Sequence, residues 1–325
     1  MGARYKRALS SDNIILKALR PKGVLRFLVS DLPSADPYAL DIQLREKDKL
    51  YYYHGRTSLL TIKLKVVGGN IKVNATADKT YNKCPEYKEL MRTWVEVEDD
   101  KLRKAFLAYL PSAIDAANPK YYGEGTEGYW QNRLCIDWGL RALPSEKFII
   151  IDRECVIGFV RTQDIDEFYR PLRKPYAEIR NRLQTNESKI FGKVREKPFG
   201  DELDMLALDK QKNLVVIELK YGNNLSGICW GPLQVLAYRD AFKSKLVEIA
   251  QDIKDLVTQK VSLGLLPRAA LSRLPVAFPS VKAVLAIAKP DFSSLCWNKL
   301  NRVIAECKVS QSIEDRENLR LITLE

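Results

Sequence analysis

The pattern of apolar and polar positions changes between Asp164 and Pro175. Before this point, short apolar runs alternate with polar segments and predict strands and short helices. After it, the pattern predicts a helix, three strands, a long helix and a further strand, which is an α/β arrangement. We therefore expect an N-terminal mixed α/β domain of unrecognised fold over residues 1–165 and a C-terminal α/β domain over residues 166–325.

The C-terminal elements follow from their periodicity. PYAEIRNRL has apolar side chains at helical spacing, at Tyr176, Ile179 and Leu183. VREKPF, DELDMLALD and NLVVIELK predict strands, and the nearly continuous apolar run of the last is typical of a strand covered on both faces. A long amphipathic helix is expected from Pro232, followed by another central strand, VKAVLAIA, and a terminal stretch, LRLITLE.

In the N-terminal half, TIKLKVV and NIKVNAT flank Gly68 and Gly69 and predict a hairpin. Lys63, Lys65 and Lys72 would then share one face, which could follow a phosphate backbone while the upstream tyrosines at 51–53 stack on bases or sugars. The solvated side of a half-buried sheet has the same pattern, so both interpretations stay open. EKFIIIDRECVIGF predicts a strand or strand pair that closes the first domain.

Composition narrows the function classes. Lys plus Arg number 53 against 41 Asp plus Glu, a formal net charge of +12 with a pI near 9.3, which favours a polyanionic partner such as nucleic acid. No apolar run approaches the roughly 18 residues of a membrane helix, and the start lacks the apolar segment of a secretory signal, so a cytoplasmic protein without a membrane partner is expected.

The cysteines and the histidine offer no recognisable centre. The 6 cysteines lie far apart without a Cys-x-x-Cys pair, and His54 is the only histidine, so a zinc or iron–sulfur site is not predicted. We expect reduced thiols in the core. His54 has no partners that would form a catalytic triad or dyad.

Charged residues interrupt two strands that are otherwise apolar. Asp204 lies within DELDMLALD, and Glu218 and Lys220 lie within NLVVIELK. If the strands pair as a hairpin, Asp204 comes beside the end that carries Glu218, and Glu218 and Lys220 point to the same face. Such carboxylates can bind Mg²⁺ or Mn²⁺, which would activate water against a phosphodiester, while the lysine positions that water or offsets transition-state charge.

These residues resemble the core of the PD-(D/E)XK nucleases, the restriction-endonuclease-like superfamily, in which an Asp on one strand precedes Glu-x-Lys on the next. The resemblance implies a mixed central sheet flanked by helices. It also implies that Asp204, Glu218 and the backbone carbonyl of Leu219 are metal ligands and that Lys220 is the catalytic lysine. The family's variable proline is absent, since Leu203 precedes Asp204.

Three further positions extend the resemblance. Gln234 and Tyr238 in PLQVLAYRDAF are similar to the Gln-x-x-x-Tyr signature of RecB-like members, and their spacing puts them on one helix face, directed to the metal or the substrate phosphate. They could instead be a capping amide and a core aromatic. Glu178 best fits a family glutamate on the first helix that reaches the metal, although a solvated helix glutamate has the same pattern.

The basic residues Lys193, Arg195 and Lys197 precede the Asp204 strand and could guide a nucleic-acid strand towards the metal, or form a solvated face. The function expected is a Mg²⁺-dependent deoxyribonuclease, with an endonuclease favoured over an exonuclease, and with RNA as the other substrate to be tested. A homodimer would allow paired cuts in both strands. The alternative is a nucleic-acid-binding protein that retains the nuclease fold without activity.

Overall fold

The computed structural model describes residues 2–10, 13–30, 36–92, 99–117, 122–161, 163–195, 199–200, 202–222, 224–292, 295–310 and 319–325. The chain divides into two compact units that interleave in sequence. Unit 1 comprises Met1–Tyr5, Ile150–Ala250 and Arg273–Glu325, and unit 2 comprises Lys6–Ile149 and Gln251–Ser272. Both contain helices and a sheet, so the α/β class is confirmed.

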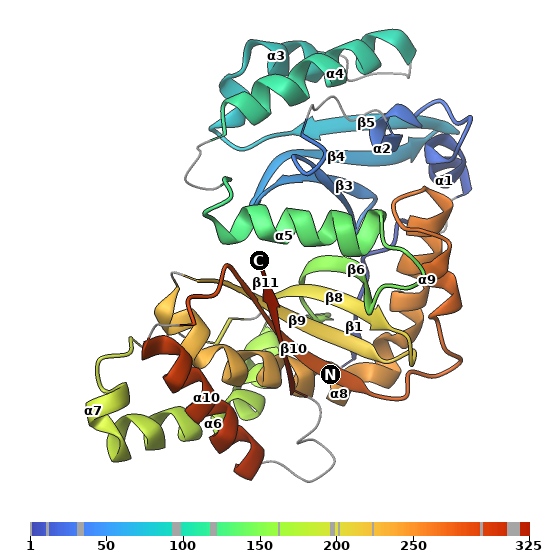
Figure 1. The fold of residues 1–325 in the computed structure, drawn as a ribbon. Helices are drawn as coiled ribbons and strands as arrows, with labels where there is room; N and C mark the ends of the chain where they lie inside the picture. Colours follow the sequence, from blue (N-terminus) through green and yellow to red (C-terminus); the bar gives the residue numbers. More distant parts are fainter. Residues whose placement is uncertain are drawn as a thin grey trace. The chain divides into compact units, whose positions relative to one another are not determined.

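The sheet of unit 1 has the order β11-β10-β9-β8-β6 (Figure 1). Its strands are β6 (Phe148–Cys155), β8 (Leu203–Asp209), β9 (Leu214–Tyr221), β10 (Val281–Ala288) and β11 (Leu319–Leu324). β8 and β9 are antiparallel, whereas β10 runs parallel to both β9 and β11. Since every residue of β9 except Tyr221 is buried, this strand is central, as its apolar run predicts.

Helices α6 (Gln163–Asn186), α7 (Ser188–Phe191), α8 (Leu225–Ser262) and α10 (Leu295–Ser310) accompany this sheet. A Cβ added at Gly231 of α8 would lie 2.8 Å from Leu285 Cδ1 of β10, so the helix backbone packs closely on the sheet. The Tyr176 hydroxyl of α6 bonds Asp240 of α8, and Arg182 of α6 pairs with Glu306 of α10. A short pair of strands, β1 (Ala3–Arg4) and β7 (Gly158–Phe159), completes the unit.

Two expectations for this unit differ from the structure. Residues 150–165 were expected in the first domain, but β6 pairs with β8 and belongs to the sheet of unit 1, while Gln251–Ser272 belongs to unit 2. The strand expected over VREKPF is not formed at Val194, Arg195 or Phe199. β6, which precedes α6 in the chain, occupies the position beside β8.

Unit 2 contains an antiparallel sheet of order β2-β3-β4-β5. Its strands are β2 (Asp41–Arg45), β3 (Lys49–His54), β4 (Thr57–Val67) and β5 (Asn70–Thr76). The expected hairpin is β4–β5, with Gly68 and Gly69 at φ +59° and +83°, values that suit glycine. The helical elements of this unit are α1 (Asn13–Leu19), α2 (Phe27–Ser30), η1 (Tyr81–Lys83), α3 (Pro85–Arg92), α4 (Asp99–Asp115), α5 (Glu127–Cys135), η2 (Ile136–Leu140) and α9 (Ala269–Ser272).

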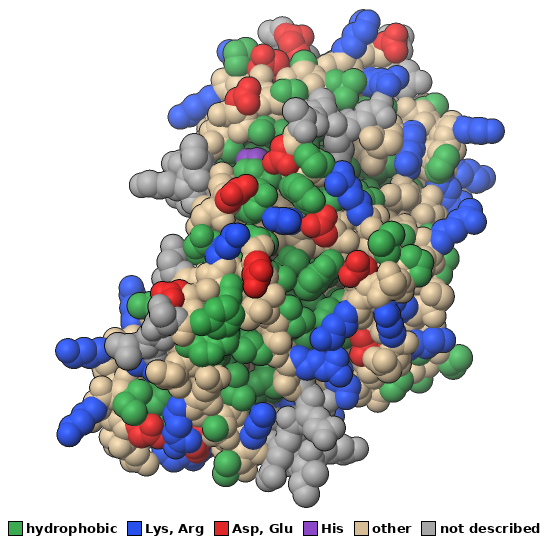
Figure 2. Space-filling view, in the orientation of Figure 1, with side chains coloured by type: hydrophobic (Ala, Val, Ile, Leu, Met, Phe, Trp, Pro, Cys, Tyr) green, Lys and Arg blue, Asp and Glu red, His purple; other side chains and the backbone are tan. Residues whose placement is uncertain are grey.

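Surface charge and hydrophobicity add two observations. On the face drawn in Figure 2, Lys and Arg side chains are spread over the surface with Asp and Glu among them, so the positive excess does not form a single patch there. Within the described residues, no helix has the length and apolar character needed to cross a membrane.

Candidate active site

The β8–β9 hairpin sets the positions of the charged residues in its strands. Met205 pairs with Ile217 and Leu208 with Leu214. Continuing this register by one residue places Asp204 opposite Glu218, as the sequence predicts. The turn is fixed by Asp209, whose Oδ1 and Oδ2 accept hydrogen bonds from the Asn213 backbone N–H (2.8 Å) and side-chain amide (2.9 Å). A slip by one residue would move Asp204 to the other face of the sheet.

The two strands stop pairing at the end that carries the charges. The backbone N–H of Asp209 donates to the Asn213 carbonyl, so these two residues form a hydrogen-bonded pair. In an antiparallel hairpin such pairs recur at every second position, and the last one here is Met205–Ile217. The next such pair would involve Leu219, but its N–H donates instead to Asp204 Oδ2, at 2.8 Å. Because the N–H and C=O of a strand residue point to the same side, the Leu219 carbonyl also faces the Asp204 side of β9.

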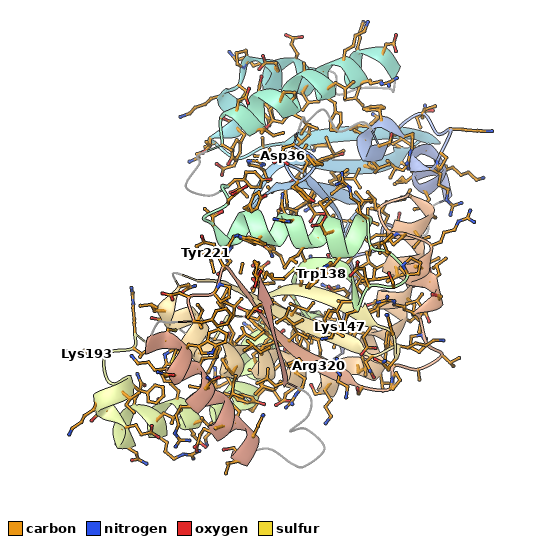
Figure 3. All side chains as sticks on the ribbon, viewed as in Figure 1. Asp36, Trp138, Lys147, Lys193, Tyr221 and Arg320 are labelled. Atoms are coloured by element: carbon orange, nitrogen blue, oxygen red, sulfur yellow. The ribbon has the colours of Figure 1, made fainter. Side chains whose placement is uncertain are left out.

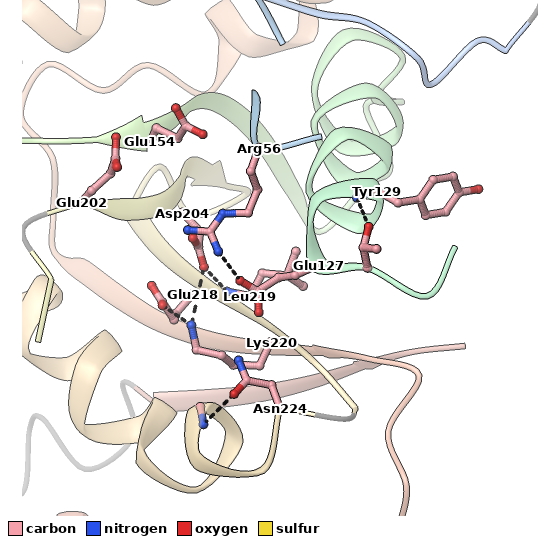
Figure 4. Close-up of polar contacts among 12 residues, drawn as sticks. Arg56, Glu127, Tyr129, Glu154, Glu202, Asp204, Glu218, Leu219, Lys220 and Asn224 are labelled. Carbon is pink, nitrogen blue, oxygen red and sulfur yellow. Dashed lines mark hydrogen bonds and ion pairs between the residues drawn. The ribbon is translucent and has the colours of Figure 1, made fainter. Parts of the chain in front are cut away.

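Glu218 and Lys220 lie side by side on the same face, and Figure 4 shows both next to Asp204. The Lys220 ammonium group donates a hydrogen bond to Glu218 Oε1 and lies 3.9 Å from Asp204 Oδ2. The Glu218 side chain is 2% exposed, that of Lys220 7% and that of Asp204 14%. An ion pair so far removed from water interacts much more strongly than a surface pair.

Tyr238 packs beside this cluster from α8. Its hydroxyl donates to the Glu202 carbonyl at 2.7 Å and accepts a hydrogen bond from Gln234 Nε2 at 3.4 Å. Burial, followed by the negative charge of Glu218, raises the pKa of Tyr238 far above its ordinary value, so the phenol stays protonated and acts as a donor. The structure therefore brings Gln234 and Tyr238 together, on the helix face that sequence spacing predicts.

The segment that leads into β8 is held by one further residue. Arg173 of α6 donates to the Gly200 carbonyl at 2.9 Å, and its guanidinium group lies 4.8 Å from the centroid of the Tyr169 ring. Together with Tyr238, Arg173 fixes the chain just before Asp204. Sequence reasoning missed Arg173, although it lies four residues after Tyr169 and three before Tyr176, on the buried side of the helix.

Glu178 is not brought to the cluster. Its side chain is exposed, whereas Tyr176, Ile179 and Leu183 of the same helix are buried. At 100° per residue, Glu178 points well away from that buried stripe and from Arg173, so the structure gives no support to Glu178 as a metal ligand.

The basic segment before β8 is described only in part. Lys193 and Arg195 are exposed, and Figure 3 labels Lys193 in the segment after α7. The backbone here is anchored, since the carbonyl of Val194 accepts from Gln184 and that of Arg195 from the Trp230 indole. Lys197 lies outside the described residues.

The oxygen atoms at this point suit a hard divalent cation. Mg²⁺ is usually held by one or two carboxylates with waters and substrate oxygens completing its shell, and Asp204, Glu218 and the Leu219 carbonyl are such donors. Within the described parts of the chain, no group of three or more His, Cys, Asp or Glu side chains could hold a metal. A cation bound here would compete with Lys220 for the Glu218 carboxylate.

Comparison of the chain with protein-family models, with curated proteins and with solved structures finds no match.

Proposed function

We propose that this protein is a metal-dependent nuclease that hydrolyses phosphodiester bonds of DNA, and that unit 1 has the restriction-endonuclease-like arrangement. The convergence of Asp204, Glu218 and Lys220 at the end of the β8–β9 hairpin carries the proposal. An antiparallel hairpin, a long helix and a strand parallel to β9 follow in the order that the PD-(D/E)XK resemblance implies.

In this proposal Asp204, Glu218 and the Leu219 carbonyl hold Mg²⁺ or Mn²⁺. The bound ion would polarise the phosphodiester and lower the pKa of a coordinated water. Asp204 accepts the Leu219 N–H bond through Oδ2, which holds the carboxylate and the carbonyl in a fixed relation. Lys220 donates a hydrogen bond to Glu218, and with a cation on that carboxylate its ammonium group would be available to position the attacking water or to offset charge on the phosphate.

Gln234 and Tyr238 position the chain that precedes Asp204. Because Tyr238 is bonded to the Glu202 carbonyl, loss of its hydroxyl group would loosen the backbone two residues from the ligand. Lys193 and Arg195 are exposed and lie before β8, where they can contact the backbone phosphates of a substrate strand.

The experiment is a cleavage assay with the purified full chain on circular, linear and single-stranded DNA and on RNA, in Mg²⁺, Mn²⁺ or EDTA. Asp204→Asn keeps an oxygen acceptor for Leu219 N–H but removes the charge, and Lys220→Ala removes the ammonium group. Both should lower the rate by at least about 100-fold, the cost typical of a lost charge-stabilising group.

Lys210→Ala is the matched control, since Lys210 is exposed in the turn at the other end of the same hairpin. It should cleave at the wild-type rate. Binding of nucleic acid without metal-dependent cleavage would favour the inactive binding protein instead. If the protein neither binds nor cleaves nucleic acid, both the nuclease and the binding-protein interpretations are refuted.

A further inference from the structure

One face of the unit 2 sheet has lysines on three of its strands, and its acidic residue, Asp41, lies on the remaining strand, β2, where it accepts hydrogen bonds from Gln43. β3, β4 and β5 contain no Asp or Glu, and Lys49, Lys63, Lys65 and Lys72 alternate with buried apolar residues along them. Lys65 and Lys72 are exposed, and Lys49 and Lys63 are half-buried. The predicted common face of Lys63, Lys65 and Lys72 is therefore confirmed by register and burial, and Lys49 joins it.

The register sets these lysines in pairs. Lys49 lies directly opposite Lys63, and Lys65 directly opposite Lys72. Like charges in this position repel and destabilise a sheet. None of the four forms an ion pair with a carboxylate among the described residues. The arrangement thus costs stability that an incoming polyanion would recover.

The opposite face is already covered, which leaves the lysine face for a ligand. Tyr52, whose side chain points to the other face, packs its ring 5.4 Å from that of Phe106 of α4. On the lysine face, the β2 end is closed, since all residues of β2 are buried and Lys260 donates to Gln43 Oε1 at 2.7 Å. The part formed by β4 and β5 remains accessible, as the exposed Lys65 and Lys72 show.

A tyrosine lies on the same face as the lysines. Tyr51 pairs with Thr61, two residue pairs along from Lys49–Lys63, so it lies on the same face as these lysines, and its side chain is half-buried. The guanidinium carbon of Arg45 lies over the Tyr51 ring, 5.9 Å from its centroid. The centroid of the Tyr53 ring is also 5.9 Å from that of Tyr51. A half-buried ring held by neighbouring side chains is a platform on which an unpaired base can stack.

We propose that this lysine face, defined by Lys49, Lys63, Lys65, Lys72 and Tyr51, binds single-stranded nucleic acid. The lysines contact successive phosphates and Tyr51 stacks on a base, a contact that the stacked bases of a duplex do not offer. The existence of a polyanion site rests on unit 2 alone, whereas the choice of nucleic acid as its ligand rests on the proposed function.

The test is fluorescence anisotropy of a labelled oligothymidylate with the full chain in EDTA, so that binding is measured without cleavage. Lys63→Gln, Lys65→Gln and Lys72→Gln combined should weaken binding at least about tenfold at low salt and reduce the slope of log K against log salt by about 2. The matched control replaces exposed lysines of α3 and α4, Lys88, Lys101 and Lys104, and should change neither quantity appreciably.

Two further variants test the stacking. Tyr51→Leu should weaken binding of the oligothymidylate, and Tyr51→Phe should restore it, because the ring is retained. Equal effects of the two lysine triples, or tighter binding of a matched duplex with no loss in Tyr51→Leu, would overturn the proposal. Failure of cleavage in Mg²⁺ with this binding intact would refute the proposed nuclease and leave the single-strand site standing.

Discussion

Replacing Lys220 by Met is the most direct test of the geometry at the end of the β8–β9 hairpin. The change keeps the length of the side chain and removes the ammonium group that contacts Glu218. With side-chain exposures of 7% and 2%, the pair belongs with buried ion pairs, for which loss of one partner costs about 3 to 5 kcal/mol, and not with surface pairs at up to about 1 kcal/mol. We expect the free energy of unfolding to fall by about 3 kcal/mol.

The double variant Glu218→Gln, Lys220→Met separates the contribution of the ion pair from the cost of leaving one of its charges buried without the other. Because the buried Glu218 charge is removed together with its partner, and Asp204 keeps its hydrogen bond from the Leu219 N–H, the double variant should lie within about 1 kcal/mol of the wild-type protein and thus be more stable than the single variant. Lys210→Met, at an exposed position of the same hairpin, should change stability by less than about 0.5 kcal/mol. Urea unfolding followed by fluorescence measures all four proteins.

Metal links this prediction to the proposed function. If a divalent cation binds between Asp204 and Glu218, Mn²⁺ at about 100 times its dissociation constant from the wild-type protein would add about 2.7 kcal/mol to the free energy of unfolding of that protein, and both this protein and Lys220→Met are compared at this concentration. The gain should be larger in Lys220→Met than in the wild-type protein, since no ammonium group has to leave Glu218. A single variant as stable as the wild-type protein would refute the buried pair, and equal or absent gains from Mn²⁺ would refute the competition.

Other expectations concern single groups. Tyr238→Phe leaves the Glu202 carbonyl without its hydroxyl donor and should cost about 1 kcal/mol of unfolding free energy in urea, so an unchanged midpoint would contradict the contact. Burial lowers the pKa of His54 below its ordinary value of 6.5, so the folded state binds fewer protons than the unfolded state and stability falls as pH drops below 6.5. His54→Asn should flatten this part of a pH series of unfolding curves, and an unaltered profile would exclude His54 as the cause. All 6 cysteines are buried thiols outside any disulfide, and burial raises the pKa of Cys307 to about 12. A thiol reagent should therefore react quickly only after denaturation, and rapid labelling of the native protein would disprove this.

The sequence predicts the hairpin of unit 1 well because the information is local. The apolar runs, the polar turn at Asp209–Asn213 and the two-residue spacing of Glu218 and Lys220 together determine the register and the common face. The ion pair between Glu218 and Lys220 is harder to predict from local sequence patterns. Whether a lysine contacts its neighbour or a ligand depends on burial by elements far away in the chain.

The misplaced elements have physical reasons. The position of β6 beside β8 is a long-range pairing, which periodicity does not report. Arg173 was missed because its carbonyl partner at Gly200 lies in an irregular segment. Glu178 could have been rejected from the sequence alone, since the apolar stripe of Tyr176, Ile179 and Leu183 already fixes the buried side of its helix.

The interleaving of the two units in the chain limits how the protein can be dissected. A fragment that starts at residue 166, the boundary that the sequence suggests, would lack β1 and β6. Without β6, the backbone of β8 would present an unpaired edge on which other copies can add strands. Such a fragment should precipitate or self-associate even though it retains Asp204, Glu218 and Lys220, so a failed assay on it would say nothing about the chemistry of the intact chain.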